Sequence, residues 1–152
     1  MNNSQYAILD SKFNDDIFEH LSALDKLCVG ADGWSADSFR SETQKDNGIV
    51  LYIMDGEHVI ALLSGYTAVG EADITSVAVH PDYRRKGLAQ SLIEHFEAHL
   101  PDDTESIFLE VRVSNCGAIA LYQKCGFEQL SIRKNFYTSP RENAVVMQKK
   151  LS

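Results

Sequence analysis

The chain has 152 residues, 44% of them hydrophobic, and a formal net charge of −8. This length suits one domain, residues 1–152, and the negative charge argues against general nucleic-acid binding. No apolar run is long enough for a membrane span or a secretory signal, and three cysteines without a CxxC pair suit a reducing compartment, so we expect a cytoplasmic protein.

Hydrophobic periodicity and turn residues predict the elements of the first half. A strand is expected at 6–10, a helix at 15–29, and a second helix from the N-cap Ser35 to about residue 45. Strands at 49–54 and 59–67 are joined by an Asp-Gly pair, which is a hairpin signal.

The second half predicts a strand at 73–80, a helix at 87–100, a strand at 106–113 and a helix at 116–124. Two final strands are expected at 127–132 and 144–149, around a loop that contains Pro140. This order predicts a mixed α/β fold, with a twisted sheet of about seven strands flanked by about four helices.

The charge is unevenly distributed along the chain. Residues 1–75 contain 13 acidic and 4 basic side chains, whereas residues 76–152 contain 9 and 10. An anionic ligand is therefore expected beside the second half and a cationic one near the first. Acidic residues that only solvate helix faces explain the pattern equally well.

Segment 77–89, VAVHPDYRRKGLA, is typical of a strand followed by a basic glycine loop and a helix start. Arg84, Arg85 and Lys86 would then lie at a helix N-terminus, where unpaired N–H groups and the helix dipole favour an anion. The sequence thus indicates a pyrophosphate site, although a basic turn without a ligand is common. It matches neither the P-loop nor the GxGxxG motif.

Three residues further on are candidates for chemistry. Glu110 lies on the more polar face of the strand predicted at 106–113, where a carboxylate costs free energy unless it is paired or used. An ion pair with Arg112 is the alternative. Tyr122 is either a core residue with its hydroxyl at the rim or a functional one, and Asn115 is a favoured helix N-cap.

Two other patterns are weaker. His95 and His99 have the i,i+4 spacing of a metal-binding pair but lack the HExxH glutamate, so solvent-facing histidines are expected and no metal site is predicted. Cys116 at a predicted helix N-terminus suggests a covalent route, but no histidine lies beside it in the sequence.

The stretch 109–127, LEVRVSNCGAIALYQKCGF, closely resembles the bacterial ribosomal-protein-alanine N-acetyltransferases, a branch of the GNAT acetyltransferases. Arg84-x-x-Gly87-x-Ala89 resembles the acyl-CoA pyrophosphate loop of the whole family. The resemblance implies a GNAT fold and acetyl transfer from acetyl-CoA to a protein N-terminal amine, by that branch the alanine of a small-subunit ribosomal protein. A small amine or a lysine side chain as acceptor, and a CoA-binding module without catalysis, are the alternatives.

The resemblance also implies residue roles. Glu110 would be the general base and Tyr122 the general acid, with Trp34 and Tyr137 beside the acceptor. Asn143, where the branch usually has an acidic residue, and Gly33, where it tends to have proline, are departures on the acceptor side. The implied acetyl-CoA contacts are Val77, Ala78, Val79, Arg84, Arg85, Lys86, Gly87, Leu88, Ala89, Gln90, Asn115 and Tyr122.

Overall fold

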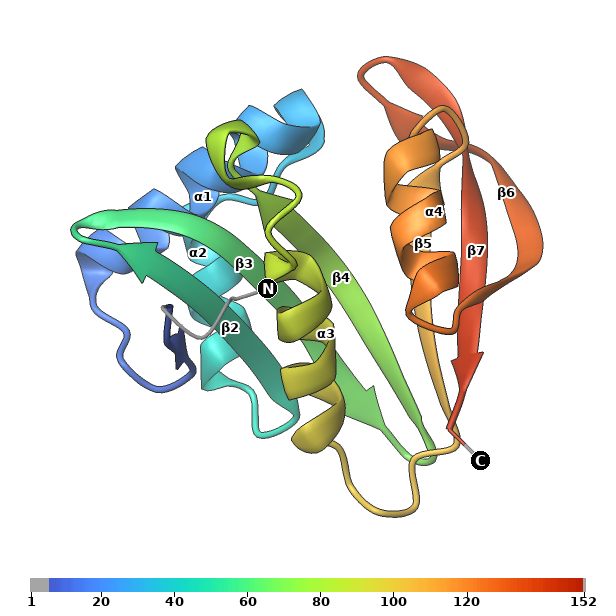
Figure 1. Cartoon of the computed structure of the whole chain (residues 1–152), viewed down its shortest axis with the longest axis horizontal. Helices are drawn as coiled ribbons and strands as arrows, with labels where there is room; N and C mark the ends of the chain where they lie inside the picture. Colours follow the sequence, from blue (N-terminus) through green and yellow to red (C-terminus); the bar gives the residue numbers. More distant parts are fainter. Residues whose placement is uncertain (1–5, 152) are drawn as a thin grey trace.

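One seven-stranded sheet runs through the computed structural model, which describes residues 6–151 (Figure 1). The strand order is β1-β2-β3-β4-β5-β7-β6, and every neighbouring pair is antiparallel except β4 and β5. The predicted mixed sheet is therefore confirmed. The strands are β1 (Ile8–Leu9), β2 (Gly48–Asp55), β3 (His58–Ala68), β4 (Glu71–Val79), β5 (Ser106–Arg112), β6 (Glu128–Thr138) and β7 (Arg141–Lys150).

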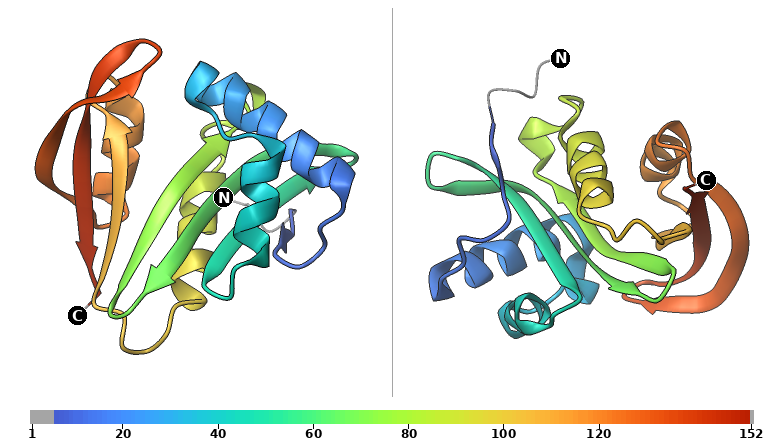
Figure 2. Two further views of the ribbon diagram at one scale, coloured as in Figure 1. Left: turned by 180° about the vertical axis from the view of Figure 1, so that it is seen from behind. Right: turned by 90° about the horizontal axis from the view of Figure 1, so that it is seen from below.

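Four α-helices cover the two faces of the sheet, as predicted. They are α1 (Asp15–Val29), α2 (Ala36–Gln44), α3 (Leu88–Ala98) and α4 (Cys116–Lys124), with short 3₁₀ turns η2 (Gly30–Asp32) and η3 (Pro81–Tyr83). Helices α1 and α2 lie on one face, and α3 and α4 lie on the other (Figure 2). Among the described residues, none of the helices combines the length and apolarity needed to cross a membrane.

Capping side chains set the helix starts where the sequence places them. The Ser35 hydroxyl accepts from the backbone N–H of Ser38, and the Asn115 side chain accepts from that of Ala118 at 3.1 Å. Helix α3 starts directly after Gly87, whose φ of 78° lies in the left-handed region. Its end at Ala98 is two residues earlier than expected.

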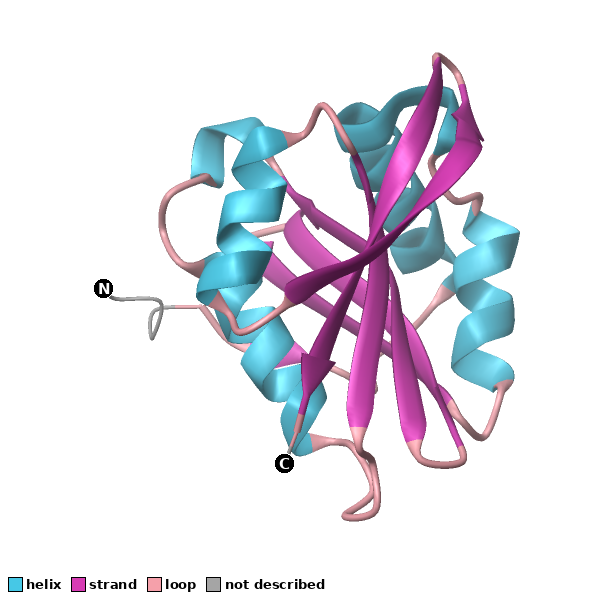
Figure 3. Cartoon of the chain, turned by 90° about the vertical axis from the view of Figure 1, so that its right-hand side faces the viewer, coloured by secondary structure: helices cyan, strands magenta, loops and turns pink. Residues whose placement is uncertain are grey.

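Each face of the sheet has its own hydrophobic core. One core joins α3 and α4 to the sheet through buried residues such as Leu92, Phe96 and Leu109. The other joins α1 and α2 to the sheet through residues such as Leu21 and Phe39. The helices enclose the twisted sheet from both sides in Figure 3.

The last hairpin is longer than predicted, because β6 and β7 extend the expected strands at 127–132 and 144–149 almost to the turn at Pro140. A register shift between Arg133 and Tyr137, with Asn135 at a φ of 55°, interrupts the alternating pattern that sequence reasoning relies on. By contrast, the first strand shortens from 6–10 to Ile8–Leu9.

The two central parallel strands are paired over only part of their length. Hydrogen-bonded pairing between β4 and β5 runs from Glu71↔Ser106 to Ile74↔Leu109 and stops there. Beyond that point the two strands diverge, as Figure 1 shows. A bulge, where Thr75 is the extra residue of β4 opposite β3, lies at this end of the pairing. The sheet is therefore open between β4 and β5.

Candidate active site

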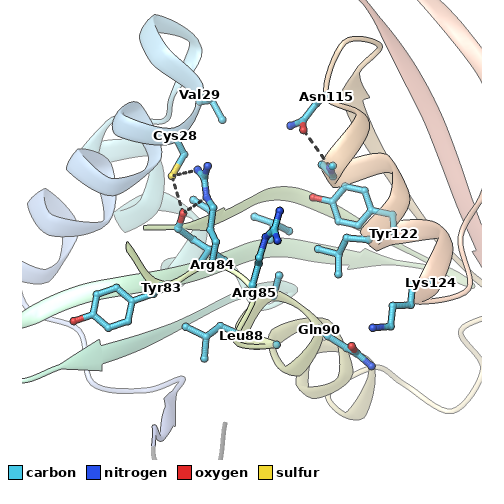
Figure 4. A pocket seen from close by; sticks show the side chains of 18 residues that line it. Cys28, Val29, Tyr83, Arg84, Arg85, Leu88, Gln90, Asn115, Tyr122 and Lys124 are labelled. Atoms are coloured by element: carbon cyan, nitrogen blue, oxygen red, sulfur yellow. Dashed lines mark hydrogen bonds between the residues drawn. The ribbon is translucent and has the colours of Figure 1, made fainter. Parts of the chain in front are cut away.

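A cavity of about 730 Å³ lies at this opening (Figure 4). The last residues of β4, the basic loop and the start of α3 form one side, while α4 and the end of α1 form the others. Every predicted acetyl-CoA contact except Lys86, which is exposed, lines this cavity. The structure thus brings together residues of β4, α3 and α4 that the sequence analysis grouped from separate motifs.

The edge of β4 that faces the opening offers backbone donors. The N–H of His80 donates to Ile60 on β3 at 2.8 Å, so this group points away from the opening. Successive N–H groups of a strand alternate in direction, and those of Val77 and Val79 therefore point into the opening. They lie where the pairing with β5 has already ended.

The basic loop divides its cations between two roles. The Nε of Arg84 donates to the backbone oxygen of Val79 at 3.1 Å, and Nη2 of Arg84 lies 3.8 Å from the sulfur of Cys28. Arg84 therefore fixes the loop against β4 and α1. The side chain of Arg85 points into the cavity in Figure 4, from a backbone with a φ of 66°. Arg85 is thus the cation best placed for an anionic ligand.

Tyr122 reaches the cavity from α4, with its hydroxyl directed toward the centre (Figure 4). Only 7% of the residue is exposed, and burial raises the pKa of its phenol far above the ordinary value. The hydroxyl therefore keeps its proton at neutral pH. Asn115 lines the cavity while its side-chain oxygen caps α4, so its capping role and a ligand contact are compatible.

Glu110 lies on the opposite face of β5 from the buried residues Leu109 and Val111. Its side chain is 29% exposed, and its Oε2 accepts a hydrogen bond from Nη1 of Arg133 on β6 at 3.0 Å. The ion pair with Arg112 considered from the sequence is therefore wrong. Arg112 is drawn away from Glu110 by two other carboxylates.

Arg112 joins two segments that are far apart in the sequence. It donates to Asp32 of η2 at 2.7 Å, and to Glu142 of β7 at 3.0 Å. Its guanidinium also lies over the ring of Tyr137, 4.3 Å from the centroid. Burial and the nearby charge of Glu110 raise the pKa of Tyr137 to about 12. Arg112 therefore holds Tyr137 and the β6–β7 hairpin against the end of α1.

Trp34 is fixed by a buried carboxylate. Its backbone N–H donates to Asp25 of α1 at 2.7 Å, and Asp25 also accepts from the hydroxyl of Ser76 on β4. Burial raises the pKa of Asp25. The Trp34 ring packs against Phe39, with centroids 5.2 Å apart. The loop that carries Trp34 is thus attached to β4 beside the opening.

Sequence reasoning missed part of the cavity lining. On α4, Ala118 lies one turn before Tyr122 on the same side of the helix. This spacing could have predicted that Ala118 lines the cavity with Tyr122. Cys28 and Val29 carried no such signal, because only the packing of α1 against β4 brings them there. The residues missed are Cys28, Val29, Tyr83, Gly117, Ala118, Leu121 and Lys124.

A strand edge with exposed donors, a cationic helix start and a buried tyrosine together suit the binding of a diphosphate-linked acyl thioester. The model of the acetyltransferase (GNAT) family matches residues 14–127, and the chain belongs to this family. It is an acetyl-CoA-dependent N-acetyltransferase with the GNAT fold, and acetyl-CoA is its co-substrate.

Similar proteins support this assignment. The ribosomal protein bS18-alanine N-acetyltransferase of Escherichia coli K12 is 36% identical over 117 residues, which cover 75% of this chain and 78% of that protein. An N-alpha-acetyltransferase of Saccharolobus solfataricus is 39% identical over 112 residues, or 70% and 65% of the two chains. The crystal structure of the E. coli ribosomal-protein-S18-alanine enzyme superposes with a TM-score of 0.81 at 30% identity, covering 97% and 94%.

Replacing Arg85 should weaken acetyl-CoA binding more than replacing Arg84, because the Arg84 side chain already binds Val79. A charged hydrogen bond contributes about 1.5–3 kcal/mol, so Arg85→Gln should raise the Kd for CoA roughly 10- to 100-fold. Isothermal titration calorimetry at two salt concentrations measures this. Arg40→Gln, which removes a cation of α2, is the control, and an unchanged Kd in Arg85→Gln would contradict the assignment.

Proposed function

We propose that this enzyme acetylates the N-terminal α-amine of a protein, with the N-terminal alanine of a small-subunit ribosomal protein as its physiological acceptor. The main support is that a buried, protonated Tyr122 lines the cavity, while Glu110 directly follows the last residue of β5 that pairs with β4. Glu110 itself does not line the cavity. The printed activity of the E. coli relative, which shares 36% identity, supports the choice of acceptor. A ribosomal acceptor places the reaction in the cytoplasm, as expected from the sequence.

In the proposed reaction the acceptor amine first loses a proton. An α-amine has a pKa of about 7.7–8.0, so most of it is protonated and not nucleophilic at neutral pH. Glu110 takes this proton, directly or through one water molecule. Because Arg133 donates to Oε2 at 3.0 Å, the carboxylate is held in one orientation while its other oxygen serves the amine.

The neutral amine then attacks the thioester carbonyl. The new C–N bond forms and the carbonyl oxygen gains negative charge, which the N–H groups of Val77 and Val79 stabilise at the open edge of β4. When the C–S bond breaks, the electron pair stays on sulfur. Tyr122 donates its proton to the departing thiolate, the new amide nitrogen loses its second proton to water, and Tyr122 regains a proton from solvent, so direct transfer requires no enzyme thiol. Cys116 accordingly has no part in this scheme; it does not line the cavity.

The acceptor face carries the negative charge that a protonated N-terminus prefers. Tyr66 on β3 marks this region, since a hydrogen bond with Asp73 and then burial raise the pKa of its phenol. The charges of Glu110 and Glu42 add to the same shift. Asp73 and Glu110 would attract a cationic amine toward this end of the sheet, and long-range attraction of this kind weakens with salt.

An acceptor screen tests the proposed function. We expect rapid release of the CoA thiol with a peptide that carries the N-terminal residues of bS18, because its α-amine is the group that the site would deprotonate. The same peptide with a blocked N-terminus and an internal lysine should be a poor substrate, as should spermidine. A preference for spermidine or the lysine peptide would contradict the proposal, and mass spectrometry of cellular protein N-termini with and without the enzyme provides the check in cells.

Glu110→Gln and Tyr122→Phe should each lower kcat by roughly 10²–10⁴-fold, which is the usual contribution of a general base or acid. Both substitutions preserve side-chain shape, so CoA affinity should stay within a few-fold of the unmodified enzyme. Stopped-time assays of peptide acetylation and calorimetry with CoA measure the two quantities. Cys116→Ala is the control and should retain full activity; near-normal turnover in either acid–base variant removes that residue from the mechanism.

Arg112→Met should lower the activity toward the acceptor peptide and leave the KM for acetyl-CoA unchanged. Removing the guanidinium leaves Asp32 and Glu142 without their cationic partner, and such losses cost about 1–3 kcal/mol of stability. A displaced Tyr137 should lower kcat/KM for the peptide roughly 10- to 100-fold. Steady-state kinetics with each substrate varied in turn measure this, and Arg40→Met serves as the matched control. An equal rise in the KM for acetyl-CoA would refute a role confined to the acceptor side.

A further inference from the structure

A second cluster of chemically active side chains lies away from the acetyl-transfer site. His95 and His99 on α3 meet Asp10, which directly follows the short strand β1. The possible ligand atoms of these three residues all lie within 4.8 Å of one another. None of the three lines the cavity described above. We propose that Asp10, His95 and His99 form a binding site for a divalent transition metal of the zinc type.

The distances fit a shared metal ion. Zinc binds histidine nitrogen and carboxylate oxygen at about 2.0–2.2 Å, so two ligands on a tetrahedral ion lie roughly 3.4 Å apart. The Nε2 of His99 is 3.1 Å from Oδ2 of Asp10, and the Nε2 of His95 is 3.8 Å from the same oxygen. These separations bracket the tetrahedral value, and both nitrogens converge on one carboxylate oxygen.

The hydrogen bond on the far side of His99 fixes which ring nitrogen is available. Its Nδ1 lies 2.9 Å from the backbone oxygen of His95, which has no proton to give. For this contact to be a hydrogen bond, Nδ1 has to carry the proton and donate it. In the neutral ring Nε2 then presents a lone pair to Oδ2 of Asp10, another acceptor, at 3.1 Å.

Two acceptors that face each other at this distance require a cation between them or a second proton on the ring. A metal-bound histidine commonly donates its other ring N–H to a backbone carbonyl, which holds the ring in position. His99 makes this contact already. The geometry is thus prepared for a metal ion, and the competing arrangement is a simple ion pair with a doubly protonated His99.

The ligand set favours zinc, nickel or copper over magnesium or calcium, because two imidazoles and one carboxylate suit borderline-soft ions. The exposed fractions of the side chains are 41% for Asp10, 38% for His95 and 34% for His99. An ion there would be accessible from solvent and would complete its coordination with water. It would also attach the two-residue strand β1 to the outer side of α3.

A metal ion that links β1 to α3 should also stabilise the fold. Strand β1 is held to β2 over only two residue pairs, Ile8↔Ile53 and Leu9↔Tyr52. An ion shared by Asp10 and α3 would add a cross-link at the end of this weakly held segment. Since a ligand that binds only the folded state stabilises it, zinc should raise the melting temperature.

Titration of the full chain with ZnCl₂, followed by calorimetry and thermal unfolding, tests the site. We expect one ion per chain and a melting temperature that rises by roughly 3–6 °C when zinc is tenfold above its Kd. MgCl₂ should have no effect. His95→Gln, His99→Gln and Asp10→Asn should each weaken zinc binding at least tenfold.

The controls separate this site from other groups that bind zinc. His20→Gln on α1 removes an exposed histidine elsewhere, and Cys116→Ser removes an exposed thiol. Both variants should bind zinc with the affinity of the unmodified chain. If the three ligand variants bind zinc as tightly as these controls, or if the unmodified chain gains no stability from zinc, the cluster is an ion pair alone and the proposal fails.

Discussion

The arrangement of the candidate site depends on the point at which β4 and β5 stop pairing. Up to Ile74 and Leu109 the two strands share ladder hydrogen bonds, and beyond them the backbone groups of β4 face an open space. Unpaired backbone donors cost free energy unless a partner arrives, so this edge is prepared for a ligand that supplies acceptors. The bulge at Thr75 lies where the pairing ends, and the cationic loop begins at Arg84, five residues after Val79. One interruption of the sheet thus aligns donors, cations and the α4 tyrosine along a single path.

Charge is separated along the same path. The basic loop and the start of α3 line the cavity, whereas Asp73, Glu110 and Glu42 form an acidic region around Tyr66 of β3. An anionic cofactor entering from the acidic face would be repelled, and a cationic acceptor would be repelled from the basic loop. The uneven charge of the two halves of the sequence therefore has a spatial counterpart, which favours one orientation of the two substrates over the reverse.

The parts of the site that were predictable are local in sequence. The basic loop, its glycine and the first turn of α3 are contiguous, and the caps Ser35 and Asn115 depend on neighbours three residues away. Long-range partners could not be predicted. Glu110 and Arg112 share a strand face, yet each forms ion pairs with residues from other elements, namely β6, β7 and η2. These partners come close only through the tertiary fold, including the strand order β5-β7-β6. The same limit applies to Asp10, which no sequence spacing connects to His95 and His99. The boundaries of β6 were missed because a bulge breaks its alternation.

The two departures that the sequence resemblance implies, Gly33 and Asn143, have physical explanations in this chain. A Cβ atom at Gly33 would lie 2.8 Å from the backbone of Lys26, so the close approach of the loop to α1 excludes proline although the φ of −64° would suit it. Asn143 uses its side-chain oxygen to accept from the backbone N–H of Asn135 at 2.9 Å, a contact that an aspartate oxygen would also make. Asn143 therefore supports the β6 irregularity without the negative charge that the sequence resemblance leads one to expect at this position. In the proposed function Asn143 lies on the acceptor side, so its neutral side chain should change the preferred charge of the peptide residues that follow the acetylated one.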